Sequence, residues 1–401
     1  MTMKPTIRGR WLGSLFAFAA LCFAHLPASA GLFAYVANAG GQNIVGYSVS
    51  GATGALTPIA GSPFNDSPAT PSHVAVTASS RFLYAPGDLG ANTVAGFSID
   101  PSTGALTPLT GSPYATGTRP AGIAIAANDA FAYVANEVSN DVSAYRIDPA
   151  TGALSAVPGS PFAAGNFPGD IVASGAFLYV GNLAVGTISA FRINAATGAL
   201  TPVPGSPFAV GASPDGLRAT PDGRFLYVIN QALGVLGYAI NAGTGALAAV
   251  AGSPFGAGTQ PFGMTISPGG AFLYTASFTT NSLSGYAIDG PTGALTPVPG
   301  GPVAAATGPI FPAFTPDGTG LYVTNLLSAN VSGYRVNAAT GALTPLAGSP
   351  FAGGGIINPF GITLANANPP VPAPALSGWS LAALSIFLLV TAARASSRLR
   401  K

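Results

Sequence analysis

The sequence predicts an all-β, seven-bladed β-propeller with four antiparallel strands per blade. Two repeats carry this prediction. The tetrapeptide Thr-Gly-Ala-Leu occurs seven times at intervals of 46 to 50 residues, and an apolar run centred on a tyrosine recurs with the same period. Repeats of this length that consist of short strands are typical of propeller blades. The tetrapeptides begin at Thr53, Thr103, Thr151, Thr197, Thr244, Thr292 and Thr340, and the tyrosines are Tyr35, Tyr84, Tyr133, Tyr179, Tyr227, Tyr274 and Tyr322.

The repeat at residues 211–255 illustrates the four strands, here called a to d in chain order. Strand a is expected at 216–220, strand b at 225–229, strand c at 236–240, and strand d from about 246. Strand b is almost entirely apolar, as expected for a strand covered on both faces. Pro221-Asp222-Gly223 forms the a–b turn, since Pro, Asp and Gly each favour turn conformations.

The register of the repeats predicts that the ring closes through its two ends. The folded part, residues 31–366, begins directly with a b strand at 32–36. After the seventh repeat comes a lone a-like strand at 359–364. If that strand joins the first blade, the blade is complete and no sheet edge is left exposed.

Residues 1–30 have the three parts of a secretory signal peptide. Lys4, Arg8 and Arg10 precede an apolar run at 11–24, and Ala28-Ser29-Ala30 provides a cleavage site. We therefore expect an exported protein. The single cysteine, Cys22, lies within this segment. The mature chain then has no disulfide and no thiolate nucleophile.

The C-terminus predicts a membrane-sorting segment at 376–401, reached through a Pro-rich linker at 367–375. The apolar run at 376–393 is just long enough to cross a membrane. The cluster Arg394, Arg398, Arg400 and Lys401 that follows it places this end in the cytoplasm. Residues 374–379 resemble the motif of the IPTL class of bacterial C-terminal sorting signals.

That resemblance implies anchoring in the inner membrane, a processing protease and transfer to the cell surface. Ala375 and Gly378 depart from the motif. A plain single-span anchor is the alternative. Under both interpretations the propeller lies outside the cytoplasm.

Charge and motif content exclude several function classes. Only 6% of the residues are charged, and residues 31–366 contain seven Arg, no Lys and twelve acidic residues. Without a basic stripe, nucleic acid is not an expected partner. No His/Cys cluster, calcium-loop spacing or phosphate-binding glycine loop occurs, so neither a metal nor a cofactor is expected.

Candidate site residues lie in the d–a and b–c loops, which open on one face of a propeller around its central channel. The mouth of that channel is the default ligand site. The predicted mouth residues are Asn38, Asp88, Asn136, Asp170, Asn182, Asp215, Asn230, Gln260, Asn325 and Asn358. The candidate catalytic residues are His73, Glu137 and Arg119. A His–Glu acid–base pair is one interpretation; isolated polar loop residues are the plainer one.

Two segments indicate a family resemblance. Residues 221–228 (Pro-Asp-Gly-Arg-Phe-Leu-Tyr-Val) and 322–325 (Tyr-Val-Thr-Asn) resemble the bacterial lactonase-type propellers, which include 6-phosphogluconolactonase and the muconate lactonizing enzymes. They also resemble surface-protein repeats named for Tyr-Val-Thr-Asn.

The family's functional residues match this chain in part. The family places a His at the start of an a strand, an Arg-His pair after Pro, and a Glu after Asn. His73 and Glu137 match. The Arg-His pair falls on Ala121 and Gly122, and Arg119 lies two positions before Ala121.

Two functional hypotheses remain. The first is a non-catalytic envelope propeller that binds a ligand or partner, or acts as a scaffold, because the Arg-His pair is missing and a sorting tail is present. The alternative is a lactonase-type hydrolase acting outside the cytoplasm. Clustering of His73, Glu137 and Arg119 within about 4–6 Å would favour the enzyme. The ligand and the oligomeric state are not identified by the sequence.

Overall fold

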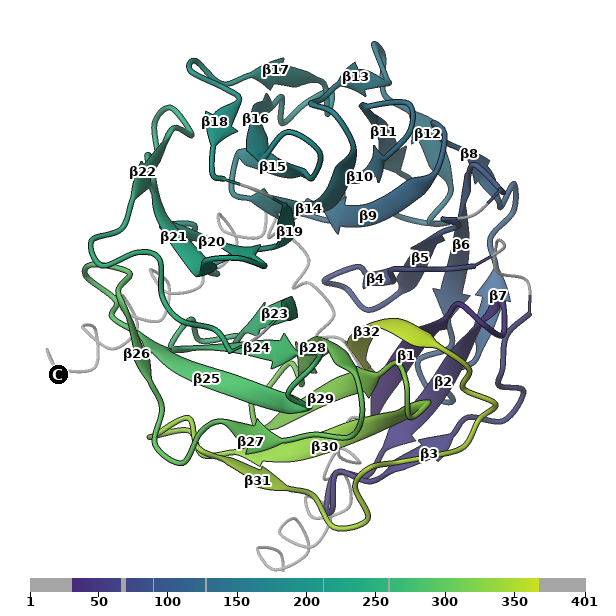
Figure 1. Ribbon diagram of the computed structural model, residues 1–401. Coiled ribbons are helices and arrows are strands. Elements are labelled where there is room, and N and C mark those ends of the chain that lie inside the picture. The colour runs from purple at the N-terminus through teal and green to yellow at the C-terminus, as the bar shows by residue number, and fades with distance from the viewer. Residues whose placement is uncertain are drawn as a thin grey trace, which may run out of the picture. The chain divides into compact units, whose positions relative to one another are not determined.

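The computed structural model describes residues 31–65, 70–88, 90–126, 128–211, 213–258 and 260–367. Seven antiparallel sheets are arranged in a ring (Figure 1), which confirms the predicted all-β, seven-bladed fold. Within the described residues there is no helix, and hence none long and apolar enough to cross a membrane. The predicted signal peptide, the sorting segment and most of the linker lie outside the described residues.

The strands of the seven blades have the following bounds. Blade 1 consists of β32 (Pro359–Asn366), β1 (Leu32–Asn38), β2 (Asn43–Val49) and β3 (Leu56–Pro58). Blade 2 consists of β4 (Ala75–Val76), β5 (Phe82–Pro86), β6 (Thr93–Ile99), β7 (Leu106–Pro108) and β8 (Tyr114–Ala115). Blade 3 consists of β9 (Pro120–Ile125), β10 (Phe131–Asn136), β11 (Asp141–Ile147), β12 (Leu154–Ala156) and β13 (Phe162–Ala163). Blade 4 consists of β14 (Pro168–Ser174), β15 (Phe177–Asn182), β16 (Thr187–Ile193), β17 (Leu200–Pro202) and β18 (Phe208–Ala209).

The remaining three blades complete the ring. Blade 5 consists of β19 (Pro214–Ala219), β20 (Phe225–Asn230), β21 (Gly234–Ile240) and β22 (Leu247–Ala249). Blade 6 consists of β23 (Pro261–Ile266), β24 (Phe272–Ser277), β25 (Ser282–Ile288), β26 (Leu295–Pro297) and β27 (Val303–Ala304). Blade 7 consists of β28 (Pro309–Phe314), β29 (Gly320–Asn325), β30 (Asn330–Val336) and β31 (Leu343–Pro345).

Each blade has its strands in the order a-b-c-d from the centre outward. The strands of blade 5 lie within one or two residues of the ranges expected from the sequence. A short fifth strand pairs with the start of strand c in blades 2, 3, 4 and 6. The b strands are buried along nearly their whole length, as their apolar composition predicts.

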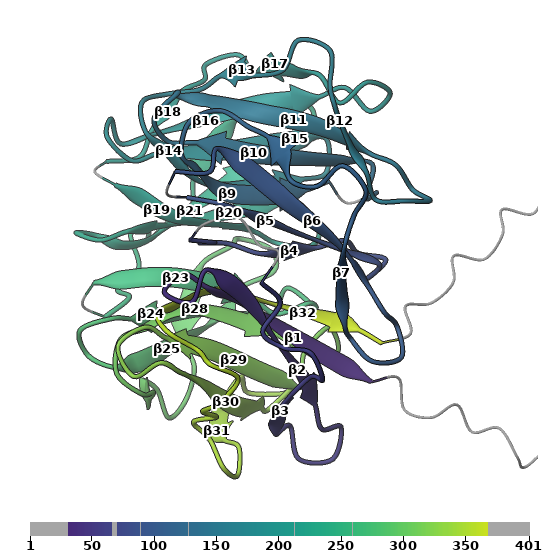
Figure 2. The same ribbon diagram turned by 90° about the vertical axis from the view of Figure 1, so that its right-hand side faces the viewer.

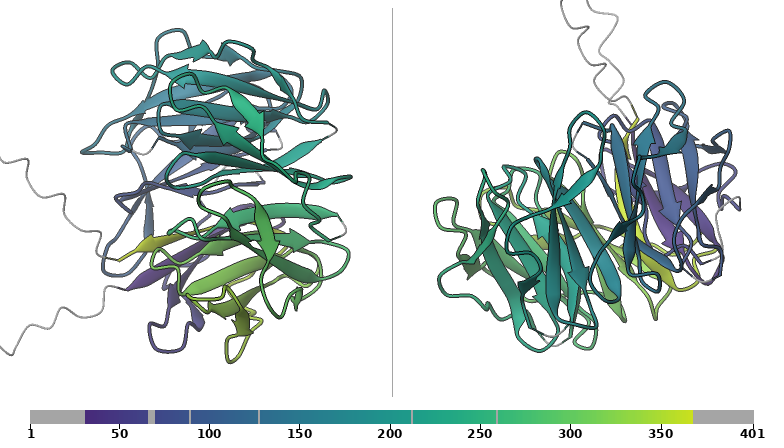
Figure 3. Two further views of the ribbon diagram at one scale, coloured as in Figure 1. Left: turned by 90° about the vertical axis from the view of Figure 1, so that its left-hand side faces the viewer. Right: turned by 90° about the horizontal axis from the view of Figure 1, so that it is seen from above.

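The a strands line the centre (Figure 1), and each contacts the next around the ring. Figure 3 shows the same ring from two further sides. Glycine makes the closest of these approaches possible. A Cβ added to Gly263 would lie 2.2 Å from the carbonyl oxygen of Ile310, and one added to Gly122 would lie 2.5 Å from that of Gly169. A side chain at either position would require the neighbouring backbone to move.

The ring closes as the sequence predicts. Strand β32 pairs with β1 in blade 1, with Tyr35 opposite Thr363 and Leu32 opposite Asn366. Figure 2 shows the two strands side by side although they come from opposite ends of the chain. Blade 1 therefore has the same four strands, a to d, as the other blades.

A hydrogen bond between neighbouring blades explains why the tyrosine and the Thr-Gly-Ala-Leu repeats occur together. The hydroxyl of each b-strand tyrosine donates to the glycine carbonyl of the next blade's tetrapeptide. The acceptors of Tyr35, Tyr84, Tyr133, Tyr179, Tyr227, Tyr274 and Tyr322 are Gly104, Gly152, Gly198, Gly245, Gly293, Gly341 and Gly54. A buried bond of this kind contributes about 1 kcal/mol. The seventh bond joins the last blade to the first.

Candidate active site

The described residues contain three ion pairs. The Nε of Arg119 lies 2.9 Å from Oδ1 of Asp88 and 3.0 Å from Oε2 of Glu137, and Nη1 of Arg218 lies 3.0 Å from Oδ2 of Asp170. Arg119 belongs to a d–a loop, whereas Asp88 and Glu137 belong to b–c loops. These contacts bring both kinds of loop together at one face of the ring, as the sequence predicts.

Glu137, the single Glu of the chain, is held in a position suited to proton transfer. It follows β10 directly, and its backbone N–H donates to the carbonyl oxygen of Arg119 at 2.9 Å. Only 11% of its side chain is exposed. Burial raises the pKa of Glu137 to about 7; Asp88 and Asp215 raise it further, while Arg119 opposes the shift. Near neutral pH the carboxyl can therefore both accept and donate a proton.

Arg119 is positioned by its backbone and by an aromatic ring. Its φ of 58° lies in the left-handed region, and its guanidinium lies 5.4 Å from the ring centroid of Phe167 in the next blade. The Nε–H donates to Asp88. With 37% of its side chain exposed, Arg119 can still be reached from solvent.

Asp170 joins blades 4 and 5. The carboxylate accepts hydrogen bonds from the backbone N–H of Ile171 at 2.9 Å, from that of Leu217 at 2.8 Å, and from Arg218. It is 6% exposed. Asp170 was predicted to lie at the channel mouth, but these bonds within the protein make it a structural group.

Arg218 is a site residue that the sequence search missed. That search considered loops, whereas Arg218 lies in strand β19. Its position could have identified it as a candidate, because no other arginine or lysine lies in the described a strands. Its side chain is 31% exposed, so the cation is accessible at the centre of the ring.

His73 contacts Phe311 and Ser72 and interacts electrostatically with Asp88, Asp170 and Arg218. Its ring packs edge-on against Phe311 with a centroid distance of 4.9 Å, and Nδ1 lies 3.4 Å from the hydroxyl of Ser72. Burial lowers the pKa of His73, and Arg218 lowers it further, while Asp170 and Asp88 oppose the shift. The imidazole is therefore neutral near pH 7. Its Nε2 is buried without a hydrogen-bond partner among the described residues.

Asp215 interacts electrostatically with Glu137, which lies beside Arg119, and with Asp170, which pairs with Arg218. Gln231 donates to its carboxylate. Burial raises the pKa of Asp215, and the charge of Asp170 adds to that shift. The groups that influence one another, here named the charged cluster, are His73, Asp88, Arg119, Glu137, Asp170, Asp215 and Arg218. Of the three candidate catalytic residues, Arg119 and Glu137 are in direct contact, whereas His73 contacts Phe311 and Ser72 and is linked to the cluster only electrostatically, through Asp88, Asp170 and Arg218.

The predicted mouth asparagines require a correction. Asn38, Asn136, Asn182, Asn230 and Asn325 have no exposed surface. Each ends a b strand, and in blades 1, 3, 4 and 7 its amide donates to the side chain that begins strand c, as Asn136 does to Asp141 and Asn182 to Thr187. These residues join strands within blades because a buried amide needs partners. Gln260 and Asn358 are exposed.

A cavity of about 490 Å³ opens beside the charged cluster, between blades 1, 2 and 7. Asp88 and Ser72, the residue before His73, are part of its lining, with Leu326, Leu327 and Phe360 supplying apolar surface. This volume is within the range of small-molecule sites. In the described residues no group of three or more His, Cys, Asp or Glu has an arrangement that could hold a metal ion.

The positions of the family's Arg-His pair cannot supply the same groups here. Ala121 is buried. Gly122 lies where β9 approaches β14, so a Cβ there would be 2.5 Å from a backbone oxygen and 3.1 Å from the Cα of Asp170. A histidine at Gly122 would therefore require these strands to separate.

Comparisons with known proteins place the chain in one family. A putative 6-phosphogluconolactonase from Bacteroides fragilis is 22% identical with a TM-score of 0.68, over 84% of this chain and 98% of that one. A periplasmic gluconolactonase from Pseudomonas aeruginosa is 19% identical with a TM-score of 0.69, over 83% and 99%.

At these identities the structural matches establish the fold alone. No curated protein matches the chain. The family model described as lactonase, 7-bladed beta-propeller matches residues 24–117, 62–260 and 251–357. The chain therefore belongs to the lactonase family of seven-bladed β-propellers.

Proposed function

We propose that this protein is a lactone hydrolase whose active site is the charged cluster. The observation that carries the proposal is the buried Glu137, whose pKa is about 7 and which lies 3.0 Å from the cation of Arg119. Family membership supports this hydrolase hypothesis more than the non-catalytic scaffold. The nearby cavity would hold the substrate ring.

The residues suggest a division of roles in the reaction. Glu137 would accept a proton from water as the water oxygen attacks the lactone carbonyl carbon. Arg119 and Arg218 would stabilise the negative charge that develops on the carbonyl oxygen. Breakage of the ring C–O bond then yields a carboxylic acid and an alkoxide, which takes a proton from Glu137. The neutral His73 would act indirectly, by positioning Ser72 of the cavity wall through Nδ1.

One observation favours the second candidate, a binding protein without catalysis. The family's Arg-His pair is replaced by Ala121 and by Gly122, which has no room for a side chain. A site that lacks one stabilising donor is typically slower by about 10²–10³. A binder of this kind would hold a polar ligand at the same cluster but release it unchanged.

Hydrolysis of glucono-δ-lactone and of its 6-phospho form distinguishes the two candidates. For the hydrolase, the purified protein accelerates ring opening, and Glu137→Gln reduces the rate by about 10²–10⁴. The control is Asp148→Asn, an exposed turn carboxylate in the same blade, which leaves the rate unchanged. If both lactones bind without being opened faster than in buffer, the binding protein is the correct interpretation.

We further propose that the protein is exported and retained at the envelope, from where the sorting segment could transfer it to the surface. The residues that support this, the signal peptide and the tail, lie outside the described residues. Replacing Arg394, Arg398, Arg400 and Lys401 with Glu removes the signal for a cytoplasmic C-terminus. Cell fractionation should then show loss of envelope retention; unchanged fractionation would contradict the proposal.

A further inference from the structure

Six of the seven contacts between neighbouring blades are filled by a phenylalanine ring. The ring lies at the start of strand b, beneath the glycine of the next blade's Thr-Gly-Ala-Leu. A Cβ added to that glycine would lie 2.4 to 2.6 Å from the ring. The phenylalanines are Phe33, Phe82, Phe131, Phe177, Phe225 and Phe272, and the facing glycines are Gly104, Gly152, Gly198, Gly245, Gly293 and Gly341.

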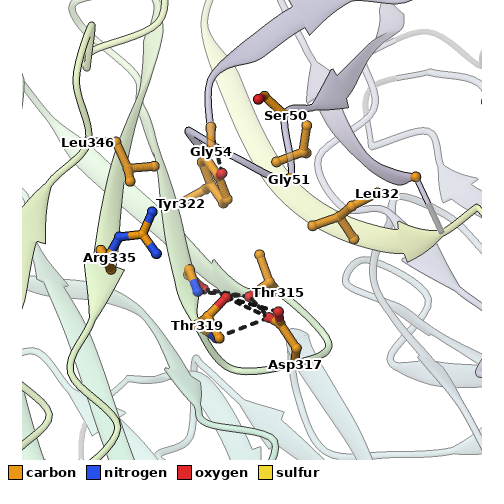
Figure 4. Close-up of a pocket in the computed structure, with 13 residues that line it drawn as sticks. Leu32, Ser50, Gly51, Gly54, Thr315, Asp317, Thr319, Tyr322, Arg335 and Leu346 are labelled. Carbon is orange, nitrogen blue, oxygen red and sulfur yellow. Dashed lines mark hydrogen bonds between the residues drawn. The ribbon is translucent and has the colours of Figure 1, made fainter. Parts of the chain in front are cut away.

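The seventh contact, between blades 7 and 1, has Gly320 in the position of the phenylalanine. The backbone arrangement is otherwise kept, since Tyr322 donates to the carbonyl oxygen of Gly54 at 2.6 Å. A cavity of about 320 Å³ results, shown in Figure 4. It is formed by an a–b turn and a c–d turn, so it lies on the face opposite to the charged cluster.

An arginine remains beside this cavity although the aromatic ring is missing. In blades 3 and 4, Arg146 and Arg192 lie opposite Phe131 and Phe177 in the strand register, with guanidinium-to-centroid distances of 4.9 and 4.8 Å. Arg335 lies opposite Gly320 in the same register. In the described chain its guanidinium makes no ion pair and no hydrogen bond.

The other charged group that lines the cavity, Asp317, already has hydrogen-bond partners within the protein. The carboxylate of Asp317 accepts hydrogen bonds from the hydroxyl of Thr315 at 2.6 Å and from the backbone N–H of Thr319 at 3.0 Å. Leu32, Val49 and Leu346 supply apolar lining. Beside Gly54 the Leu346 side chain lies where the phenylalanine ring lies in the other contacts, since a Cβ on Gly54 would be 2.7 Å from its Cδ1. The cavity that remains combines apolar surface with one available cation.

We propose that this cavity, the seam pocket, binds a small aromatic carboxylate of the benzoate class. The ring packs against Leu346 and Leu32 in the space that the missing phenylalanine leaves, and the carboxylate pairs with Arg335. A dry cavity of about 150 Å³ accommodates benzene, so the seam pocket has room for the carboxylate as well. Planar, two-pronged pairing with a carboxylate is the geometry that arginine favours. This site is independent of the proposed hydrolase function.

Binding of benzoate to the purified full-length protein, measured by calorimetry and by thermal shift, tests the proposal. Saturable binding is expected, with a rise in Tm. Arg335→Gln should weaken binding by about tenfold or more, whereas Arg146→Gln, the matched arginine of blade 3, should leave it unchanged. Benzylamine should bind more weakly than benzoate, because its ammonium group would face Arg335.

Filling the seam pocket gives a second, independent measurement. Gly320→Phe should raise the Tm of the free protein and abolish benzoate binding. A Cβ at Gly320 would lie 2.9 Å from Cγ2 of Thr315, so that side chain has to shift. Blade 5 accommodates a phenylalanine in the same backbone arrangement, since Phe225 and Thr220 have the hydrogen bond that Gly320 and Thr315 have here. Absence of saturable benzoate binding, stronger binding of benzylamine, or retained binding in Gly320→Phe would each overturn the proposal.

Discussion

The carboxylate of Glu137 lies 3.0 Å from the Nε of Arg119, yet the N–H of that nitrogen donates to Asp88. Glu137 is thus close to a cation without receiving its hydrogen bond. The effect of burial on the pKa of Glu137 therefore outweighs the opposing effect of the Arg119 charge, and this pKa is about 7.

Lactone hydrolysis should increase with pH through an apparent pKa of about 7, because Glu137 must be deprotonated to accept a proton from water. Arg119→Gln removes the charge that opposes the rise of this pKa, so the midpoint of the pH–rate profile should move to higher pH. Arg81→Gln is the control, since the Arg81 guanidinium donates to the carbonyl oxygens of Pro149 and Ala150 and lies over the ring of Phe82, without an acidic partner in the described residues. A midpoint that does not respond to Arg119→Gln would exclude Glu137 as the titrating base.

Protein stability should depend on pH through the same carboxyl group. The pKa of Glu137 is higher in the folded state, so the folded state binds more protons than the unfolded state between about pH 4.5 and 7. Its contribution to the free energy of unfolding therefore falls as pH rises through this window. Glu137→Gln should match the wild type near pH 4 and be more stable at pH 8, by up to about 3 kcal/mol. Denaturant unfolding at both pH values checks this; equal differences at pH 4 and pH 8 would contradict it.

The fold could be predicted from the sequence because each blade repeats the same local information. The tyrosine and the Thr-Gly-Ala-Leu elements recur together since they bond across every contact between blades, Tyr322 to Gly54 included. The closing strand was visible because a lone a strand follows the last repeat. These repeats can be recognised in the sequence without knowing which side chains are in contact.

The site was less predictable because it depends on side-chain direction. Asn136 and Asn182 follow apolar strands and resemble loop residues in sequence, but their amides turn inward to strand c. Arg218 was overlooked because it lies within a strand. Sequence spacing alone also could not show that Arg119, Asp88 and Glu137 meet, since they belong to two blades.

Close packing around the centre should make Gly122 intolerant of any side chain. Gly122→Ala places a Cβ 2.5 Å from the carbonyl oxygen of Gly169, and overpacking of this kind costs about 1–3 kcal/mol. Gly216→Ala is the matched control in blade 5, because its nearest neighbour is the end of the Ile229 side chain at 3.2 Å. Free energies of unfolding from denaturant titration should show the larger loss for Gly122→Ala. An equal or smaller loss would mean that β9 and β14 can separate at no cost.

Asp170 should matter more for stability than for chemistry. Its carboxylate accepts from two backbone N–H groups and from Arg218 while being 6% exposed. Asp170→Ala leaves the buried N–H of Leu217 without this partner, and an unsatisfied buried N–H typically costs about 1–3 kcal/mol. The guanidinium of Arg218 loses its ion pair as well. Asp148→Ala, at an exposed turn, is the control. Thermal unfolding should show a large fall in Tm for Asp170→Ala alone.

Ring closure should be essential for the monomeric state. Deleting 359–366 removes β32, so the backbone groups of β1 that pair with it become an exposed edge. An open, apolar edge of this kind invites pairing with other chains. Blade 7 also loses a contact with β32, because the hydroxyl of Thr324 donates to the carbonyl oxygen of Phe360 at 2.6 Å.

We expect the deletion variant to aggregate or form higher oligomers in size-exclusion chromatography, with a lower Tm. A chain truncated after residue 368 keeps every described strand and serves as the control, which should elute and melt as the intact propeller does. If the deletion variant also stays monomeric with an unchanged Tm, β32 does not lock the ring.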